Sequence, residues 1–364
     1  MFLALRELRQ AKLRYALIGM IMILIAWLTF MVTGLANGLA TDNASAIQNM
    51  KAHSFILQKE ADQKLGRSVL TPKVLKDIQD QVGETNATPL SETTISLQEE
   101  GTTDKMDITV FGMDPTSFVA PAVKQGQSLH TDELNEAVVS EGLKANGVEI
   151  GDVLKNDDVN QSFKVIGFTN KSMFSHTPVI YVNMKQFQAL QHAMGKANIS
   201  YQAIVLQGKL ESLGKSVVDV QLLTKEEMVQ SIPGFKEEQG SLTMMTVFLV
   251  VIAAFVQAGF FYVLTLQKTS QFGVLKAIGT TTFYLTKSVI GQVLILAASA
   301  IIIGLGLTYG VSTLLPDSMP FVLSNNTILQ YTAILLMVSM LGASLSLLQI
   351  TRIDAIEAIG RAEA

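Results

Sequence analysis

Cysteine is absent from the 364 residues of this chain, and histidine occurs only four times. Without cysteine the chain can form no disulfide, no thiolate metal site and no cysteine nucleophile. The histidines are His53, His130, His176 and His192, and no two of them stand at the spacing of a known metal motif. We therefore expect no catalytic residue, no metal site and no intrinsic cofactor.

Charged residues are also few, since they make up 16% of the chain, whereas soluble domains contain about 25%. The deficit is concentrated in four long stretches without Asp, Glu, Lys or Arg. A helix needs about 20 apolar residues to cross the hydrocarbon layer, so each stretch has room for one crossing. We predict four transmembrane helices, at 15–40, 241–267, 288–315 and 328–350. A short outer loop, 316–327, joins the last two.

The distribution of positive charge predicts the orientation. Residues 1–14 carry four basic side chains and one acid, and residues 268–287 carry three lysines and no acid. The segment 42–238 instead carries 18 basic and 26 acidic residues. Because positive loops stay in the cytoplasm, we expect both termini (1–14 and 351–364) and the 268–287 loop on the cytoplasmic side of the membrane. No Lys/Arg-rich run is present, which argues against a nucleic-acid partner.

The first apolar stretch has an alternative interpretation as a cleaved signal peptide. Its leading segment is basic, and Gly38-Leu39-Ala40 resembles a cleavage site. The apolar core of a signal peptide is about 7–15 residues long, however, and the charge-free stretch here spans 27 residues. Its length favours a retained membrane helix.

The segment 41–240 predicts a mixed α/β domain outside the cytoplasm. After Thr71-Pro72, apolar residues recur at spacings of three and four, which predicts a helix that Thr71 caps and Pro72 begins. Short apolar runs between glycines predict strands, including one over 147–154. We expect one lobe built from 41–118 and 200–240, with a smaller lobe, 119–199, inserted into it.

Residues 208–216 imitate a phosphate-binding loop, because they follow a predicted strand and end in Gly-Lys-Ser. A true loop of this kind has four residues between its glycines, and this one has five. Any role driven by ATP therefore requires binding and hydrolysis of ATP by a partner chain.

The 268–287 loop contains a candidate partner-binding helix. Phe272, Leu275 and Ile278 stand three residues apart, which places them along one edge of a short helix, with Lys276 beside them. Such an edge can dock on a cytoplasmic protein. The alternative is an amphipathic helix that lies on the lipid surface.

The same run, Gly-Val-Leu-Lys-Ala-Ile-Gly from Gly273 to Gly279, resembles a segment of the MacB/FtsX-like (type VII) ABC transporter permeases. The tail from Arg352 to Ile359 is similar to the segment that ends those chains, although their usual proline is missing. One helix, an outer domain and three further helices match that family over the whole chain. The resemblance implies a homodimer in the lipid bilayer that binds two copies of a cytoplasmic ABC ATPase. The implied coupling residues are Phe272, Gly273, Leu275, Lys276, Ile278 and Gly279.

Within this family the chain most resembles the haem-efflux (HrtB-like) and glycolipid-export (DevC-like) branch, in residues 1–8, 30–39 and 255–273. This resemblance implies export of haem by mechanotransmission, in which ATP binding moves the stalk helices and the outer domain. Methionine and carboxylate side chains can ligate haem iron, and aromatic rings can line a slot for the macrocycle. The expected haem-binding residues are Met31, Glu238, Met244, Met245, Trp27, Phe30 and Phe248. The methionines and aromatic residues are also ordinary packing residues of membrane helices, and the alternative for Glu238 is a solvated carboxylate at the membrane interface.

Three other functions stay open at this point. The permease could export a glycolipid or an antimicrobial peptide, in which case a periplasmic adaptor is expected. It could transport nothing and regulate a cell-wall hydrolase, as cell-division permeases do. It could also act as a sensor with a histidine kinase partner.

Overall fold

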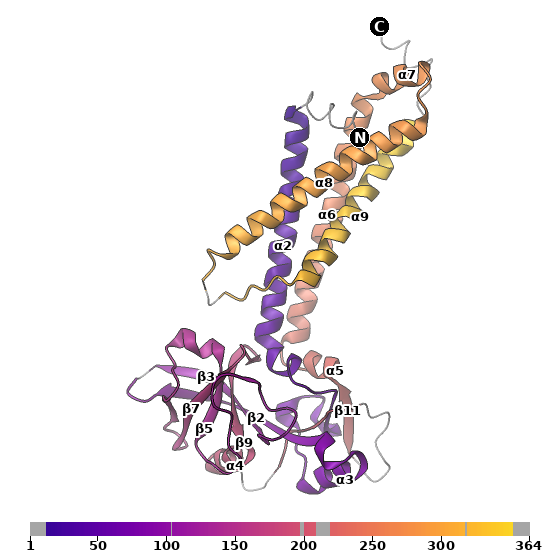
Figure 1. The fold of residues 1–364 in the computed structure, drawn as a ribbon. Coiled ribbons are helices and arrows are strands. Elements are labelled where there is room, and N and C mark those ends of the chain that lie inside the picture. Colours follow the sequence, from indigo (N-terminus) through magenta and orange to yellow (C-terminus); the bar gives the residue numbers. More distant parts are fainter. Residues whose placement is uncertain (1–11, 103, 197–199, 209–218, 317–318, 352–364) are drawn as a thin grey trace. The chain divides into compact units, whose positions relative to one another are not determined.

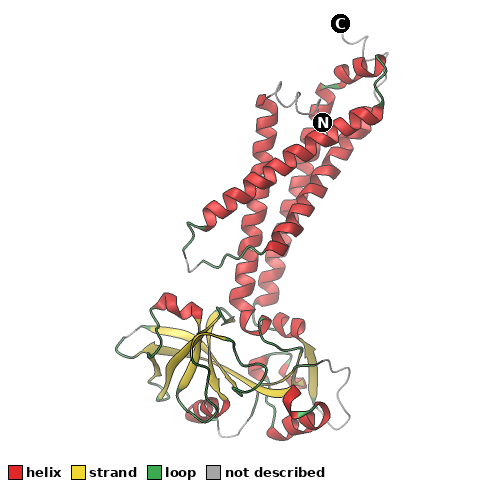
Figure 2. Ribbon diagram, viewed as in Figure 1, coloured by secondary structure: helices red, strands yellow, loops and turns green. Residues whose placement is uncertain are grey.

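The structure is a computed structural model that describes residues 12–102, 104–196, 200–208, 219–316 and 319–351 (Figure 1). Contacts divide the chain into two compact units, Met1–Gly38 with Gly240–Ala364, and Leu39–Gln239. Most of each long helix belongs to the first unit, the strands belong to the second, and Figure 2 distinguishes helices from strands by colour. Most of the predicted tail 351–364 and of the Gly-Lys-Ser segment 208–216 lies outside the described residues.

Four described helices are long and apolar enough to cross a membrane, and each predicted span overlaps one of them. They are α2 (Lys12–Gln48), α6 (Phe235–Gln267), α8 (Thr282–Ser312) and α9 (Asn325–Thr351). At 1.5 Å per residue, the 37 residues of α2 extend about 55 Å, whereas the hydrocarbon layer is about 30 Å thick. α2 is therefore longer than one crossing requires, and it extends beyond the predicted span 15–40 to Gln48.

The first unit is held together by apolar packing between helices and by one close backbone approach. Tyr15, Phe261 and Val293 share one cluster, which joins α2, α6 and α8. Farther along α2, Phe30 packs with residues of α8 and α9. The segment between α8 and α9 lies against α2, where the Val322 amide donates to the Gly34 carbonyl at 2.9 Å.

The strands of the second unit form one continuous sheet in the order β11-β1-β10-β2-β3-β9-β5-β7-β4. The strands are β1 (Ser54–Gln58), β2 (Ala87–Glu99), β3 (Lys105–Met113), β4 (Val123–Gly126), β5 (Glu136–Ser140), β6 (Val153–Asn156), β7 (Gln161–Thr169), β8 (Met173–Phe174), β9 (Thr177–Asn183), β10 (Ala203–Leu206) and β11 (Val220–Thr224). The shorter helices are α3 (Pro72–Val82), α4 (Met184–Ala193), α5 (Lys225–Gln230) and α7 (Thr269–Ala277), the last in the first unit.

The long strand β2 belongs to two different arrangements. Its first residues pair with β10, which continues the antiparallel sheet through β1 to β11. Its last residues, Gln98 and Glu99, pair with β6, which also pairs with β7. Strands β2, β3, β9, β5, β7 and β6 thus pair in a closed ring around an apolar interior that includes Leu97, Phe163 and Val182. β2 thus belongs both to the antiparallel sheet and to the closed ring. The predicted division into lobes at 119 and 199 stays a prediction.

Local chemistry explains where the predicted elements hold and where they fail. α3 begins at Pro72, and the Thr71 side chain accepts a hydrogen bond from the Val74 amide, which confirms the predicted cap. The predicted strand over 147–154 is wrong for most of its length, since β6 begins only at Val153. Gly147 and Gly151 have φ angles of 92° and 107°, a left-handed backbone that breaks the extended run into turns.

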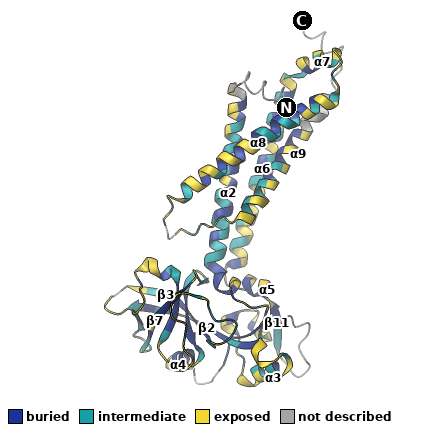
Figure 3. Cartoon of the chain, viewed as in Figure 1, coloured by how far each residue is buried: buried dark blue, intermediate teal, exposed yellow. Residues whose placement is uncertain are grey.

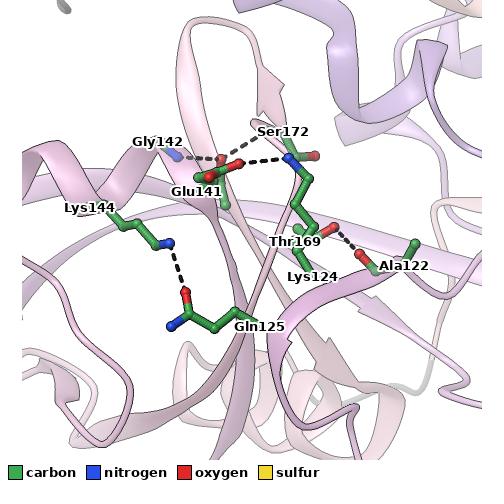
Figure 4. Close-up of polar contacts among 9 residues, drawn as sticks. Ala122, Lys124, Gln125, Glu141, Gly142, Lys144, Thr169 and Ser172 are labelled. Atoms are coloured by element: carbon green, nitrogen blue, oxygen red, sulfur yellow. Dashed lines mark hydrogen bonds and ion pairs between the residues drawn. The ribbon is translucent and has the colours of Figure 1, made fainter.

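Polar contacts fasten β4 and the turn after β5 to the end of β7 (Figure 4). Lys124 forms an ion pair with Glu141 at 3.0 Å, which lowers the pKa of that carboxyl. The Thr169 hydroxyl donates to the Ala122 carbonyl at 2.8 Å. Nearby, the Ser172 hydroxyl shares a short hydrogen bond with Tyr181, and burial raises the pKa of Tyr181 to about 12. These contacts hold β4, the turn after β5 and the end of β7 together.

Candidate functional site

The predicted coupling loop folds as a helix that packs on the start of α8. α7 ends at Ala277, and Gly279 follows with a φ angle of 96°, a conformation that favours glycine. The Thr280 amide donates to the Leu275 carbonyl at 2.9 Å, which closes the last turn. The final glycine of the Gly273–Gly279 run is therefore required by the turn between α7 and α8.

The coupling residues fall on two different sides of this segment. Phe272 is 2% exposed and packs with Leu275 against Leu285 and Val289 of α8. Ile278, in contrast, is 75% exposed. Other apolar side chains left open in this segment are Val274, Phe283 and Tyr284. The predicted edge of Phe272, Leu275 and Ile278 is thus divided, so that the first two fix the helix in place and the third is available to a partner.

The haem-binding residues predicted in the first unit also separate by exposure. Met244 and Phe248 of α6 are 56% and 58% exposed, and Met245 is also exposed. Exposed residues, drawn in yellow, recur along α6 (Figure 3). Met31 and Trp27 of α2 are partly buried. Phe30 is fully buried among residues of α8 and α9, so its ring does not line an open slot as the sequence analysis expected.

Glu238 lies in the second unit, within a polar cluster that sequence reasoning missed. The side-chain amide of Asn43 donates to Glu238 Oε2 at 3.2 Å and lies 3.2 Å from His176 Nε2. His176 Nε2 and Glu238 Oε2 are 3.5 Å apart. Asn43 is fully buried, and its Oδ1 atom has no hydrogen-bond partner among the described residues. No sequence spacing could indicate this cluster, because its members stand 133 and 195 residues from Asn43.

A tight hairpin brings His176 to this cluster. β8 and β9 are joined by Ser175-His176, and both residues have positive φ angles, of 48° and 65°. Two-residue hairpins usually place Asn-Gly at such positions, because other side chains are strained there. The hairpin also binds the outer end of α2, since the Ser175 amide donates to the Asn43 carbonyl at 2.8 Å and the Met173 amide donates to Ser45 Oγ at 2.9 Å.

A cavity of about 360 Å³ opens next to this hairpin in the second unit. Its lining combines cationic side chains, one carboxylate and apolar groups: Lys64, Arg67, Glu92, Phe174, Met228 and Ile232. Burial raises the pKa of Glu92, and the positive charge of Lys196 partly opposes that shift. Such a mixed lining does not select one class of ligand.

Comparisons with known proteins identify the family. A family model described as FtsX-like permease C-terminal matches residues 243–355. A protein of Staphylococcus epidermidis named putative hemin transport system permease protein HrtB is 30% identical over 365 residues, 99% of each chain. This chain belongs to the FtsX-like ABC transporter permeases.

Another relative and one solved structure match different shares of this chain. The putative hemin transport system permease protein HrtB of Staphylococcus haemolyticus is 29% identical over 363 residues, which cover both chains completely. Among solved structures, the periplasmic region of MacB from Actinobacillus actinomycetemcomitans matches with a TM-score of 0.36 and 14% identity, over 52% of this chain and 96% of that one.

The family assignment confirms the resemblance noted in the sequence. It also agrees with the predicted fold class, an α-helical membrane protein with four transmembrane helices and a mixed α/β extracytoplasmic domain between the first and second. The chain is a multi-pass membrane protein, and it is the permease subunit of an ABC transporter, which is not itself catalytic.

Proposed function

We propose that this permease exports haem from the bacterial cell membrane and is powered by two copies of a separate cytoplasmic ATPase. The observation that carries the proposal is similarity over the full length, at 29% and 30% identity, to proteins named as hemin transport permeases. Haem is then the transported ligand, and ATP is bound by the partner chain. Haem detoxification is the corresponding role in the cell.

The proposed orientation places both termini and α7 in the cytoplasm. This orientation rests on the positive charge of residues 1–14 and 268–287. In it, the exposed side chains of Ile278 and Phe283 face the side where an ATPase is found. An apolar group of this kind can fill a groove on a partner, so we assign the ATPase contact to this surface.

The exposed face of α6 supports a homodimer in the bilayer. Only 17% of the most apolar window of α6 is buried, whereas the corresponding share of α8 is 44%. Met244, Phe248, Ile252 and Phe255 recur at intervals of three and four residues, so they follow one side of the helix. In the proposal, this stripe contacts a second copy of the chain and, where it is not covered, lipid.

For haem, we propose Met31, Glu238, Met244 and Met245 as candidate iron ligands, with Trp27 and Phe248 against the macrocycle. Met244 and Phe248 are exposed and one helical turn apart, so a flat apolar ligand can contact both. The Nε1 atom of Trp27 is buried without a hydrogen-bond partner among the described residues. Phe30 supports this region only from within the helix packing.

A haem titration of the purified full-length chain in detergent tests the proposal, with the Soret band as the signal. We expect saturable binding in the wild type and a loss of about tenfold or more in affinity when a ligand is removed. The variants are Met31→Ala, Glu238→Ala and Met244→Ala. Met337→Ala is the matched control, because Met337 is an exposed methionine of α9 that is not among the proposed ligands.

Two results would overturn the proposal. Binding that never saturates indicates partitioning into detergent. Binding that weakens equally in Met244→Ala and Met337→Ala indicates a general effect of removing exposed methionine. Reconstitution with the ATPase and measurement of ATP-dependent haem release then separates binding from export.

A further inference from the structure

A compact polar network lies where α6 meets α7. The ammonium group of Lys268 donates to the Tyr15 hydroxyl at 2.8 Å and to Gln292 Oε1 at 3.4 Å. The Tyr15 hydroxyl in turn donates to Gln292 Oε1 at 2.9 Å. These three residues belong to α2, to the α6–α7 junction and to α8. One cation, one phenol and one amide thus connect three helices.

The surroundings of this network are apolar, which makes its polar contacts strong and costly to break. Tyr15 and Gln292 are both buried. Phe261, Phe272 and Val289 line the same place. In a low-dielectric environment a hydrogen bond to a charged group gains strength, and a polar group that loses its partner is penalised. The network therefore resists any separation of the three helices at this point.

Lys268 is also the residue at which the chain changes direction. α6 ends at Gln267 and α7 begins at Thr269, and between them Lys268 has φ −97° and ψ 0°, outside the helical region. The Lys268 carbonyl accepts from the Phe272 amide at 2.9 Å, so its backbone belongs to the first turn of α7. Its side chain contacts α2 and α8. A movement of α7 must therefore pull on Tyr15 or break the network.

We propose that Tyr15, Lys268 and Gln292 form the joint through which α7 moves α2. They are positioning residues that couple ATP-driven motion of α7 to the helix that continues into the outer domain. This inference rests on the proposed ATPase contact at α7. It adds a specific route, because α2 is a single unbroken helix from Lys12 to Gln48 and transmits a displacement of its first turns along its length.

The first experiment needs neither ATPase nor haem. Because the chain has no cysteine, Ala16→Cys and Ala277→Cys, both at exposed positions, carry two spin labels without background. Labelled chain is diluted with unlabelled chain, so that only distances within one chain are recorded. We expect one narrow distance distribution in the otherwise native chain and a broader or shifted one in Lys268→Met and Gln292→Leu. Tyr309→Phe, an exposed tyrosine of α8, is the control for Tyr15→Phe. Unchanged distributions in all three joint variants overturn the proposal.

The second experiment measures coupling in the complete transporter with its ATPase. We expect Lys268→Met to retain ATP hydrolysis, while haem exported per ATP falls about tenfold, the effect of losing a charge-assisted hydrogen bond. Lys268→Arg should recover most of that ratio. If the amount of haem exported per ATP is unchanged in Lys268→Met, whether or not the rate of hydrolysis falls, a coupling role is contradicted. If the wild type exports no haem, the proposed function fails, whereas the spin-label distances still decide whether the joint exists.

Discussion

Replacing one glycine of α2 with alanine should show whether steric contact or helix propensity dominates the stability of the chain at that position. Gly38 lies where the segment before α9 passes over α2. A Cβ atom at Gly38 would be 2.2 Å from the carbonyl oxygen of Pro320 and 2.3 Å from its carbonyl carbon. Both atoms are backbone, so Gly38→Ala must displace the segment or the helix. At Gly34 a Cβ atom would instead meet the tip of the Phe321 ring at 2.3 Å, and a ring can turn away.

The expected magnitudes follow from opposing effects. Overpacking of this kind costs about 1–3 kcal/mol. A displaced segment also stretches the hydrogen bond from the Val322 amide to the Gly34 carbonyl, which contributes about 0.5–1.5 kcal/mol. Replacing a helical glycine with alanine returns up to about 1 kcal/mol. We expect Gly38→Ala to be destabilising by about 1–3 kcal/mol and Gly34→Ala by less.

Gly306→Ala provides the matched control, because Gly306 is a helical glycine of α8 whose added Cβ atom would meet nothing within 4 Å. This variant should be neutral or up to about 1 kcal/mol more stable than the wild type. The assay is reversible unfolding of the full chain in mixed micelles with increasing denaturing detergent, followed by helicity. If Gly38→Ala were as stable as Gly306→Ala, the close contact between α2 and the 319–322 segment would not exist.

Three further predictions address the outer domain and the coupling segment. Because burial raises the pKa of Glu92 above 4.5, its ionised form opposes folding, and stability falls as pH rises from that value through the folded-state pKa. Glu92→Gln should therefore raise the unfolding temperature at pH 7 but not at pH 4. Glu84→Gln, at an exposed site, should leave the unfolding temperature unchanged at both pH values. An equal change of unfolding temperature in the two variants would contradict a role of burial at Glu92. Asn43→Ala should destabilise the chain by about 1–3 kcal/mol, since it removes a buried donor to the Glu238 carboxylate. Asn43→Asp should be more destabilising at pH 7 than at pH 4. An unfolding temperature of Asn43→Ala equal to that of the wild type would refute a stabilising role of Asn43. Ile278→Ser should weaken ATPase binding at least about tenfold without changing the unfolding temperature, because it truncates an exposed anchor. Phe272→Ala should lower the unfolding temperature, since it leaves a cavity in the packing against α8. If Phe272→Ala weakened ATPase binding alone and Ile278→Ser lowered the unfolding temperature, the roles of the two residues would be exchanged.

The membrane helices could be predicted from the sequence because the bilayer imposes a local rule. Every residue of a spanning helix must be compatible with hydrocarbon, so charge-free stretches mark the spans without any knowledge of their partners. The same holds for the cap of α3, which depends on residues three apart. The strand predicted over 147–154 failed because glycines with positive φ look the same in sequence as glycines within a strand.

The closed ring of strands and both polar clusters depend on residues far apart in the chain. The pairing of Glu99 with Leu154 closes the ring, and no periodicity within either strand predicts it. The sequence gives no spacing that joins His176 to another site residue, because its proximity to Glu238 exists only after the β8–β9 hairpin has formed. The sequence places Phe272 on a partner-binding edge because Phe272, Leu275 and Ile278 recur three residues apart. In the structure, Phe272 and Leu275 pack against α8 instead.

The polar contacts of α2 fit a helix that transmits movement better than one that only anchors a domain. An anchor requires only apolar packing, whose attraction is not directional. α2 instead carries directional bonds at both of its ends. Tyr15 is bound by Lys268 and Gln292 in the first unit, and in the second unit the backbone of Asn43 accepts from the β8–β9 hairpin. Hydrogen bonds lose their strength within a fraction of an ångström, so each end holds α2 at one defined position. A helix fixed in this way cannot slide past these partners without breaking a bond, and in the proposed mechanism a displacement imposed at Tyr15 is passed along α2.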